Sequence, residues 1–139
     1  MKRLFFAGSL MLVTLSFVGC ATTAETALES DSQVKLRSIQ SRRFETCDKT
    51  KALRTAIATL QDLGFVIDKA DNTLGTVSAT KLSGYNMRMT VSVRPSGDKE
   101  LIVRANAQYN LKAVENPEPY QQFFAAYEKA MFLTAHSVD

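Results

Sequence analysis

The sequence contains few of the residues on which most catalytic and metal sites depend. Of its 139 residues, one is histidine and two are cysteine. Ser/His/Asp catalysis needs a histidine between a serine and a buried aspartate, and His136 is instead expected at the end of a helix. No Cys/His cluster has metal-ligand spacing, and no glycine-rich loop has the spacing that cradles a phosphate. The sequence therefore predicts a protein that is not an enzyme and has no metal site or cofactor.

The sequence also carries little net charge. Its formal charge is +3, and Lys2 and Arg3 belong to an N-terminal segment that we expect to be removed, which leaves +1. A nucleic-acid-binding domain usually shows a strongly basic patch or stripe. We therefore expect no nucleic-acid partner.

The longest apolar run is short and lies at the N-terminus. It extends over residues 4–18, whereas a membrane-spanning helix needs about 20 predominantly apolar residues. Lys2 and Arg3 precede this run and a small residue ends it. A basic head, an apolar run and a small residue at the cleavage point are typical of a secretory signal peptide, which we expect at residues 1–19.

The residues Val18, Gly19 and Cys20 resemble the lipobox of bacterial lipoproteins, with Phe17 where leucine is usual. The resemblance implies cleavage before Cys20 and a membrane anchor through acyl chains on this cysteine, and several chains hold a protein more firmly than one. No aspartate follows Cys20, which by similarity to enterobacterial lipoproteins favours the periplasmic face of the outer membrane. The alternative is an ordinary secreted protein whose cleavage site adjoins a cysteine.

Once Cys20 carries lipid, Cys47 is the only remaining thiol. An intrachain disulfide is then impossible. Cys47 could be a reactive thiol or could pair with another chain, but a lone cysteine is more often a small, half-buried apolar side chain. We therefore expect Cys47 to be half-buried.

The mature chain divides into a tether and one domain. Residues 20–35 are rich in Ala, Thr, Ser, Asp and Glu, which predicts a flexible, lipid-anchored tether. Residues 36–139 are enough for one domain, beginning with an extended, basic edge strand over residues 36–46.

Apolar spacing predicts a helix from Asp48 to Leu63. Thr46 or Asp48 can cap its N-terminus, and Gly64 can take the left-handed conformation that ends a helix. Short strands are expected at residues 65–68 and 74–82.

Strict alternation predicts two long antiparallel strands, at residues 85–94 and 101–110, joined by a turn at residues 95–98. The expected core-facing residues are Tyr85, Met87, Met89, Val91 and Val93 on the first strand and Leu101, Val103, Ala105, Ala107 and Tyr109 on the second. This hairpin is the strongest structural prediction of the sequence.

A last helix is expected from Pro117 to about His136. Phe123, Tyr127 and Met131 form one apolar stripe, which Phe124 and Phe132 widen. The predicted fold is α+β: one four- to five-stranded antiparallel sheet with two helices packed on one face.

The segment 53–80 combines an amphipathic helix, the step Leu63-Gly64, a short strand, an acidic turn at Asp71 and a strand that contains Gly75. It resembles the helix-grip domain of the C lipoprotein of the bacterial β-barrel assembly machinery, over roughly residues 40–135. The resemblance implies a helix-grip-like fold but not membership of that machinery.

Two surfaces are candidate binding sites. The sheet face opposite the helices would present polar and basic residues suited to carboxylates or phosphates: Arg88, Arg94, Arg104, Asn106 and Gln108. A groove between helix and sheet would be lined by Tyr85, Met87, Met89, Tyr109 and Phe123. A simply solvated sheet face and a plain core are the alternatives for these two sets.

Two functions are consistent with these surfaces. The first is a lipid-anchored periplasmic interaction domain, an accessory subunit of a cell-envelope assembly or transport complex that binds another envelope protein. The second is a lipoprotein that binds a small ligand or lipid in the helix–sheet groove. The first predicts a closed core, and the second predicts a cavity of several hundred Å³.

Overall fold

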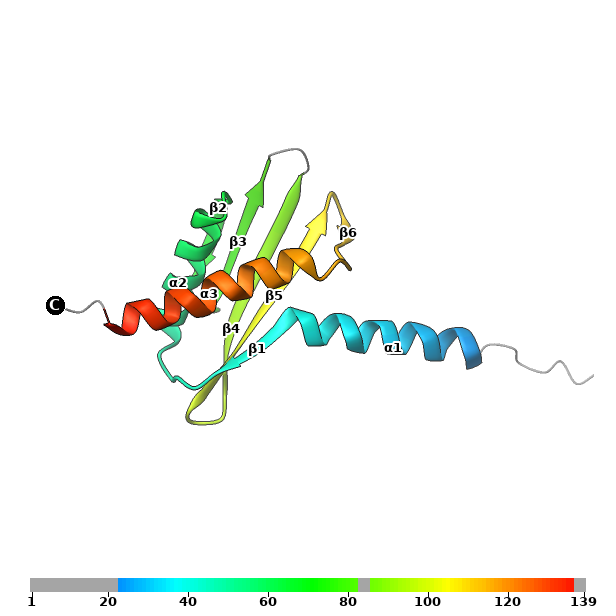
Figure 1. The fold of residues 1–139 in the computed structure, drawn as a ribbon, viewed down its shortest axis with the longest axis horizontal. Coiled ribbons are helices and arrows are strands. Elements are labelled where there is room, and N and C mark those ends of the chain that lie inside the picture. Colours follow the sequence, from blue (N-terminus) through cyan, green and yellow to red (C-terminus); the bar gives the residue numbers. More distant parts are fainter. Residues whose placement is uncertain (1–22, 83–85, 137–139) are drawn as a thin grey trace, which may run out of the picture.

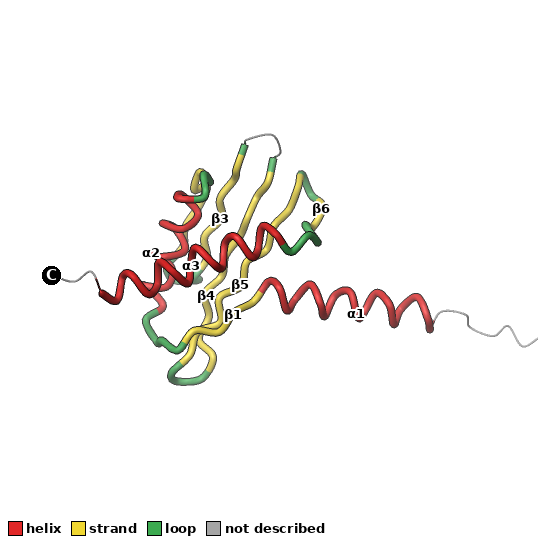
Figure 2. The backbone as a smooth tube through the Cα atoms, in the orientation of Figure 1, coloured by secondary structure: helices red, strands yellow, loops and turns green. Residues whose placement is uncertain are grey.

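The computed structural model describes residues 23–82 and 86–136, which form three helices and a six-stranded antiparallel sheet (Figures 1 and 2). The elements in chain order are α1 (Thr23–Gln40), β1 (Ser41–Phe44), α2 (Lys49–Asp62), β2 (Val66–Asp71), β3 (Thr76–Lys81), β4 (Met87–Ser96), β5 (Glu100–Tyr109), β6 (Lys112–Ala113) and α3 (Glu118–His136). The strand order is β1-β5-β4-β3-β2, and β6 pairs with β5. The α+β class is confirmed, with one helix and at least one short strand more than expected.

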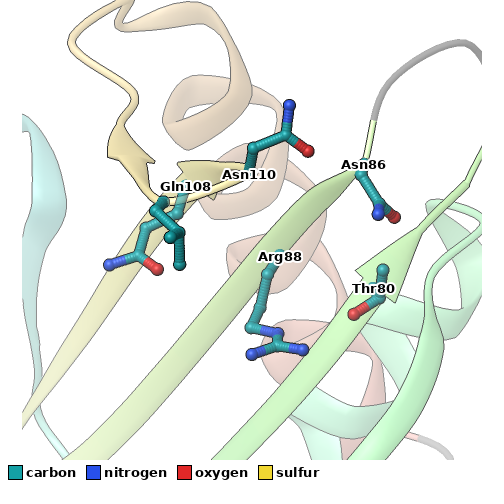
Figure 3. Close-up of a pocket in the computed structure, with 6 residues that line it drawn as sticks. Thr80, Asn86, Arg88, Gln108 and Asn110 are labelled. Carbon is teal, nitrogen blue, oxygen red and sulfur yellow. The ribbon is translucent and has the colours of Figure 1, made fainter.

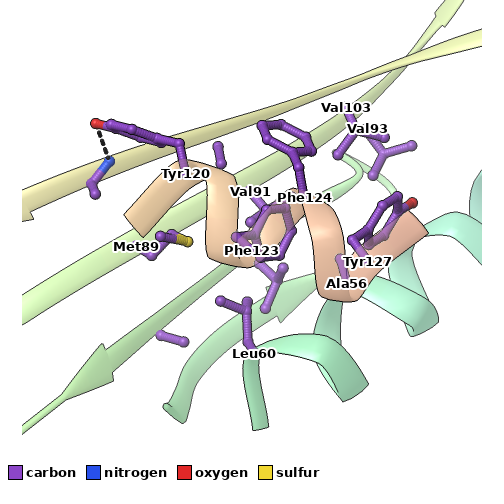
Figure 4. Close-up of a cluster of buried hydrophobic side chains, with 14 of the residues drawn as sticks. Ala56, Leu60, Met89, Val91, Val93, Val103, Tyr120, Phe123, Phe124 and Tyr127 are labelled. Carbon is purple, nitrogen blue, oxygen red and sulfur yellow. Dashed lines mark hydrogen bonds between the residues drawn. The ribbon is translucent and has the colours of Figure 1, made fainter. Parts of the chain in front are cut away.

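Helices α2 and α3 cover one face of the sheet, and α1 leads away from it (Figure 1). The core lies between these layers, where aromatic side chains of α3 meet valines of β4 and β5 (Figure 4). Its largest fully buried side chains are Tyr120, Tyr127, Phe123, Phe124, Leu60 and Met89. The opposite sheet face carries no helix in the described part of the chain.

The predicted boundaries of α2 are confirmed. Asp48 caps the helix because its carboxylate accepts a 2.8 Å hydrogen bond from the backbone N–H of Lys51. Gly64 has φ +83°, the left-handed conformation expected after the C-terminus. The chain then turns directly into β2.

The hairpin of β4 and β5 also follows the predicted alternation. The predicted core positions from Met89 to Val93 and from Leu101 to Ala107 are at most 1% exposed. The turn is shifted, because β4 continues through Pro95 to Ser96, and Gly97 takes the positive φ. Tyr109 was expected in the core but is 36% exposed, since it ends β5 at the rim of the sheet.

The structure differs from the sequence prediction over residues 23–40. Helix α1 occupies residues expected to be a flexible tether and the start of an extended segment. Low hydrophobicity predicted the tether, but Ala, Glu, Leu, Gln and Lys also have high helix propensity. At its C-terminal end, Leu36 and Ile39 pack against the core and Gln40 is buried. These contacts help to hold the last turn.

The end of α3 differs as well. Phe132 was expected to widen the buried face of this helix, but it is 66% exposed, and Leu133 is 53% exposed. Met131, one position earlier, still packs against the core. The buried stripe of α3 is therefore confined mainly to Tyr120–Tyr127.

Candidate functional site

The sheet face that α2 and α3 leave uncovered, hereafter the outer face, carries all five predicted partner-binding residues. Strand register places Arg88 opposite Gln108, Asn106 opposite Thr90, Arg104 opposite Ser92 and Arg94 opposite Ile102. On β3, Thr76, Ser78 and Thr80 extend this face sideways. The outer face is thus a polar surface of guanidinium, amide and hydroxyl groups around Ile102.

The five residues do not form one cluster. Arg88 and Arg94 lie at opposite ends of β4, and six residues of a strand span about 20 Å. Arg88 pairs with Gln108 near the β3–β4 end, whereas Arg94 lies near the β4–β5 turn. The outer face therefore has one arginine of β4 at each end, and hydroxyl side chains with Arg104 and Asn106 lie between them.

At the β3–β4 end, the outer face is hollowed. A cavity of about 130 Å³ is lined by Thr80, Asn86, Arg88, Gln108, Asn110 and Leu111 (Figure 3). Arg88 Nε lies 3.8 Å from Asp68 Oδ2, and the same carboxylate oxygen accepts a 2.7 Å hydrogen bond from Thr80 Oγ1. The Arg88 side chain is 64% exposed, so this ion pair contributes little to stability.

At the other end, Arg43 of β1 lies opposite Ile102, and Ile102 lies opposite Arg94. Arg43 pairs with Glu100 across 3.9 Å, whereas Arg94 is exposed and forms no ion pair with any described residue. Arg94 is therefore the predicted partner-binding arginine that is most open to an acidic partner.

The middle of the outer face is tied to α1 through Gln40, which sequence reasoning missed. Gln40 Oε1 accepts a 3.3 Å hydrogen bond from Arg104 Nη2, and Gln40 Nε2 lies 3.4 Å from Asn106 Oδ1 and 3.2 Å from the Tyr120 hydroxyl. Gln40 is 3% exposed although it borders the solvated face. No sequence pattern marked it, because its burial depends on the gap between β1 and β6 along β5.

The predicted groove is only partly present. Met87, Met89 and Tyr109 line a hollow of about 220 Å³ at the end of the helix layer. Phe123 is fully buried in the core and does not line it, and Tyr85 lies outside the described residues. The hollow is smaller than the 300–1,000 Å³ typical of ligand pockets.

Charged and polar groups form the rest of the groove lining. Lys81 Nζ donates a 2.8 Å hydrogen bond to the carbonyl of Leu63 and lies 5.6 Å from the Phe65 ring centroid. Glu118 and Gln122 approach from the first turns of α3. This rim is more polar than the apolar lining expected for a lipid.

The remaining candidates lie elsewhere. Cys20 is outside the described residues. Cys47 is exposed, so the expectation of a half-buried side chain was wrong: it lies in the loop between β1 and α2, and loops run over the surface.

The described residues contain no group of three or more His, Cys, Asp or Glu side chains placed to hold a metal ion. None of the helices in this part of the chain has both the length and the hydropathy needed to cross a bilayer.

Neither a protein-family model nor a curated protein significantly matches the sequence, so the fold and the outer face are the basis for a functional assignment.

Proposed function

We propose that the protein is a non-catalytic, lipid-anchored periplasmic domain that binds another envelope protein, as an accessory or interaction subunit of a cell-envelope assembly or transport complex. The observation that carries this proposal is the outer face, a broad strip of arginine, amide and hydroxyl side chains that neither α2 nor α3 covers. Arginines and amides are suited to hydrogen-bonding carboxylates and peptide groups of a partner.

The chemistry of the outer face favours a polar, charge-steered contact. Ile102 is the main apolar side chain among its positions on β4 and β5, and it is half-buried. Binding through such a face depends on complementary charge, which guides encounter and selects partners. Exposed charges are screened within about 8–10 Å at physiological ionic strength, so the contact should weaken as salt is raised.

The anchor follows from the lipobox resemblance at Cys20. Cys20 precedes the first residue of α1, Thr23, by three positions. An 18-residue helix is about 27 Å long, so α1 would act as a spacer between the membrane and the domain. A helical spacer sets this separation more firmly than the flexible tether predicted from composition.

The hollow lined by Met87, Met89 and Tyr109 favours one alternative, a lipoprotein that binds a small ligand. Its volume of about 220 Å³ would admit only a compact molecule or part of a larger one. Met89 is 1% exposed in the core, so the half-buried Met87 is the better position to fill: Met87→Trp would block such a site while leaving the outer face in place.

The test is an affinity pull-down of the full-length protein from solubilised membranes. We expect one envelope protein to be recovered in stoichiometric amount, and to be lost with Arg94→Glu on the outer face. Arg54→Glu is the matched control, because Arg54 is an exposed arginine on α2.

Three outcomes separate the possibilities. Retention of the partner by Arg94→Glu, or its equal loss from both variants, would exclude the outer face as the interface. Recovery of a small molecule or lipid that Met87→Trp abolishes would favour the groove instead. Mass spectrometry of the mature protein should find acyl chains on an N-terminal Cys20, and an unmodified Cys20 would exclude the lipid anchor.

A further inference from the structure

The hollow at the β3–β4 end of the outer face has a distinctive composition. Five of the six described residues that line it have side chains that can form hydrogen bonds, three of them through amides, and no acidic residue is among the six (Figure 3). The amides are those of Asn86, Gln108 and Asn110, and the sixth side chain is the apolar Leu111. We refer to these six residues, Thr80, Asn86, Arg88, Gln108, Asn110 and Leu111, as the amide pocket.

Arg88 is the one charged side chain among the described residues of the lining. Its Nε lies 3.8 Å from Asp68 Oδ2, which is longer than a hydrogen bond. The Nη1 and Nη2 atoms form no hydrogen bond with any described residue. The guanidinium therefore keeps donors available, and a carboxylate is the group that an arginine fork binds best, through two parallel hydrogen bonds.

The amides are held beside Arg88 by the backbone. The N–H of Asn110 donates a 3.3 Å hydrogen bond to the carbonyl of Asn86, and Asn110 adopts a left-handed φ of +47° that asparagine tolerates well. Gln108 lies directly opposite Arg88 in the sheet. A side-chain amide has both donors and an acceptor, so it can pair with a peptide group next to a carboxylate.

Size limits the occupant. The cavity of about 130 Å³ is small, so only the end of a chain can enter it. Leu111 is 94% exposed at the edge of the pocket and can cover an apolar side chain. The three requirements are a carboxylate, an adjacent peptide group and an apolar side chain, and the last residue of a polypeptide meets all of them.

We infer that the amide pocket binds the C-terminal residue of a partner polypeptide, with its carboxylate on Arg88, its last peptide group on the side-chain amides and its side chain against Leu111. This inference rests on the proposed function, since it assigns chemistry to one end of the same outer face. It also explains why Arg88 and Arg94 lie about 20 Å apart: a partner would place its chain end at one and an acidic region at the other.

The experiment is a titration of a small ligand into the purified full-length protein in detergent. The NMR signals of the side-chain amides report binding. The probe is N-acetyl-leucine. The controls are N-acetyl-leucinamide, which lacks the carboxylate, and the α-methylamide of N-acetyl-aspartic acid, in which only the side-chain carboxylate is free. We expect saturable shifts with N-acetyl-leucine and a dissociation constant in about the millimolar range, given so small a ligand. Both controls should bind at least about tenfold more weakly than N-acetyl-leucine.

Variants locate the site. Arg88→Gln should weaken binding of N-acetyl-leucine about tenfold or more, and Arg54→Gln, an exposed position on α2, should leave it unchanged. Retained dispersion of the core amide signals shows that each variant is folded. Equal binding of N-acetyl-leucinamide, equal binding of the side-chain acid, or no saturable shift would overturn the inference. A partner that still depends on Arg94 in the pull-down would then show that the proposed function stands without this pocket.

Discussion

The side-chain amide of Gln40 donates a hydrogen bond to the hydroxyl of Tyr120 across 3.2 Å, although the two residues are 80 positions apart. The same hydroxyl donates to the carbonyl of Val114 at 2.7 Å and accepts from the backbone N–H of Ala107 at 3.3 Å. One phenol therefore joins the end of α1 to β5 and to the segment that leads into α3.

The need for this contact arises from the sheet. Along β5, pairing with β1 stops at Arg104 and pairing with β6 begins at Gln108. Ala107 lies between them, and a buried backbone group without a partner costs stability. The hydroxyl of Tyr120 and the N–H of Val114 satisfy the N–H and the carbonyl of Ala107.

The first prediction concerns this hydroxyl. Tyr120→Phe should lower the free energy of unfolding by about 1–3 kcal/mol, because it leaves buried polar groups of Ala107, Val114 and Gln40 without their partner. Urea unfolding followed by circular dichroism measures the change.

The matched control is Tyr127→Phe. The hydroxyl of Tyr127 donates only to the carbonyl of Ala52, at 3.0 Å, and this carbonyl lies within α2, where the helix supplies another donor. Tyr127→Phe should therefore lower the free energy of unfolding by less than Tyr120→Phe does. An equal or larger loss for Tyr127→Phe would contradict the role assigned to Tyr120.

The second prediction compares three glycines with positive φ. Gly64→Ala and Gly97→Ala should each cost about 1–2 kcal/mol through backbone strain alone, because a Cβ would meet only an ordinary contact with Lys81 at Gly64 and nothing at Gly97. At Gly75, a Cβ would lie 2.5 Å from the carbonyl oxygen of Val93. Gly75→Ala should therefore be the most damaging, and thermal unfolding of the three variants tests this order.

The third prediction concerns Thr59 in α2, which is 1% exposed. Its hydroxyl has no hydrogen-bond partner among the described residues. Thr59→Val keeps the branched shape and removes the unsatisfied group, so it should raise stability by about 1 kcal/mol.

Thr55→Val provides the comparison one turn earlier, because the Thr55 hydroxyl donates a 3.0 Å hydrogen bond to the carbonyl of Lys51. This variant should not gain stability. If urea unfolding shows Thr59→Val to be the less stable of the two, the hydroxyl of Thr59 has a partner that these contacts do not include.

The fourth prediction concerns alkaline pH. Burial raises the pKa of the Tyr127 phenol above its ordinary value of 10.0. Below pH 10 both folded and unfolded chains keep this proton, so the stabilising contribution is complete. Above pH 10 the unfolded chain loses the proton while the folded chain retains it, and stability falls by up to about 1.4 kcal/mol per pH unit.

Tyr127→Phe isolates this contribution, because the other titrating groups are common to both proteins. The difference in unfolding free energy between wild type and Tyr127→Phe should be constant from pH 7 to 9. Above pH 10 the wild type should lose stability relative to Tyr127→Phe. A pH-independent difference would mean that the phenol is not buried as described.

Much of the fold could be predicted from local patterns. Alternation assigned the core face of β4 and β5 from Met89 to Val93 and from Leu101 to Ala107, and apolar spacing with Asp48 and Gly64 located α2. These features depend on periodicity and on capping within a few residues, which the sequence displays directly.

The candidate site was predicted less completely. Alternation predicted Arg88, Arg94 and Arg104 on one face. The register then placed Arg88 and Arg94 at opposite ends, with Arg104 between them beside Gln40. The amide pocket needs Thr80, Asn86 and Asn110 from three different segments, and composition does not bring these together. Helix α1 was not predicted, because the low hydrophobicity of its sequence is typical of a flexible tether.

Neighbouring residues along the chain specify which side of β4 and β5 is apolar, where α2 begins and ends, and that β4 and β5 form a hairpin. Long-range packing specifies that β1 stops pairing at Arg104, that Gln40 and Tyr120 fill the gap beside Ala107, and that the outer face ends in a hollow. These features depend on where strands from distant parts of the chain stop relative to one another, and no local periodicity encodes that relationship.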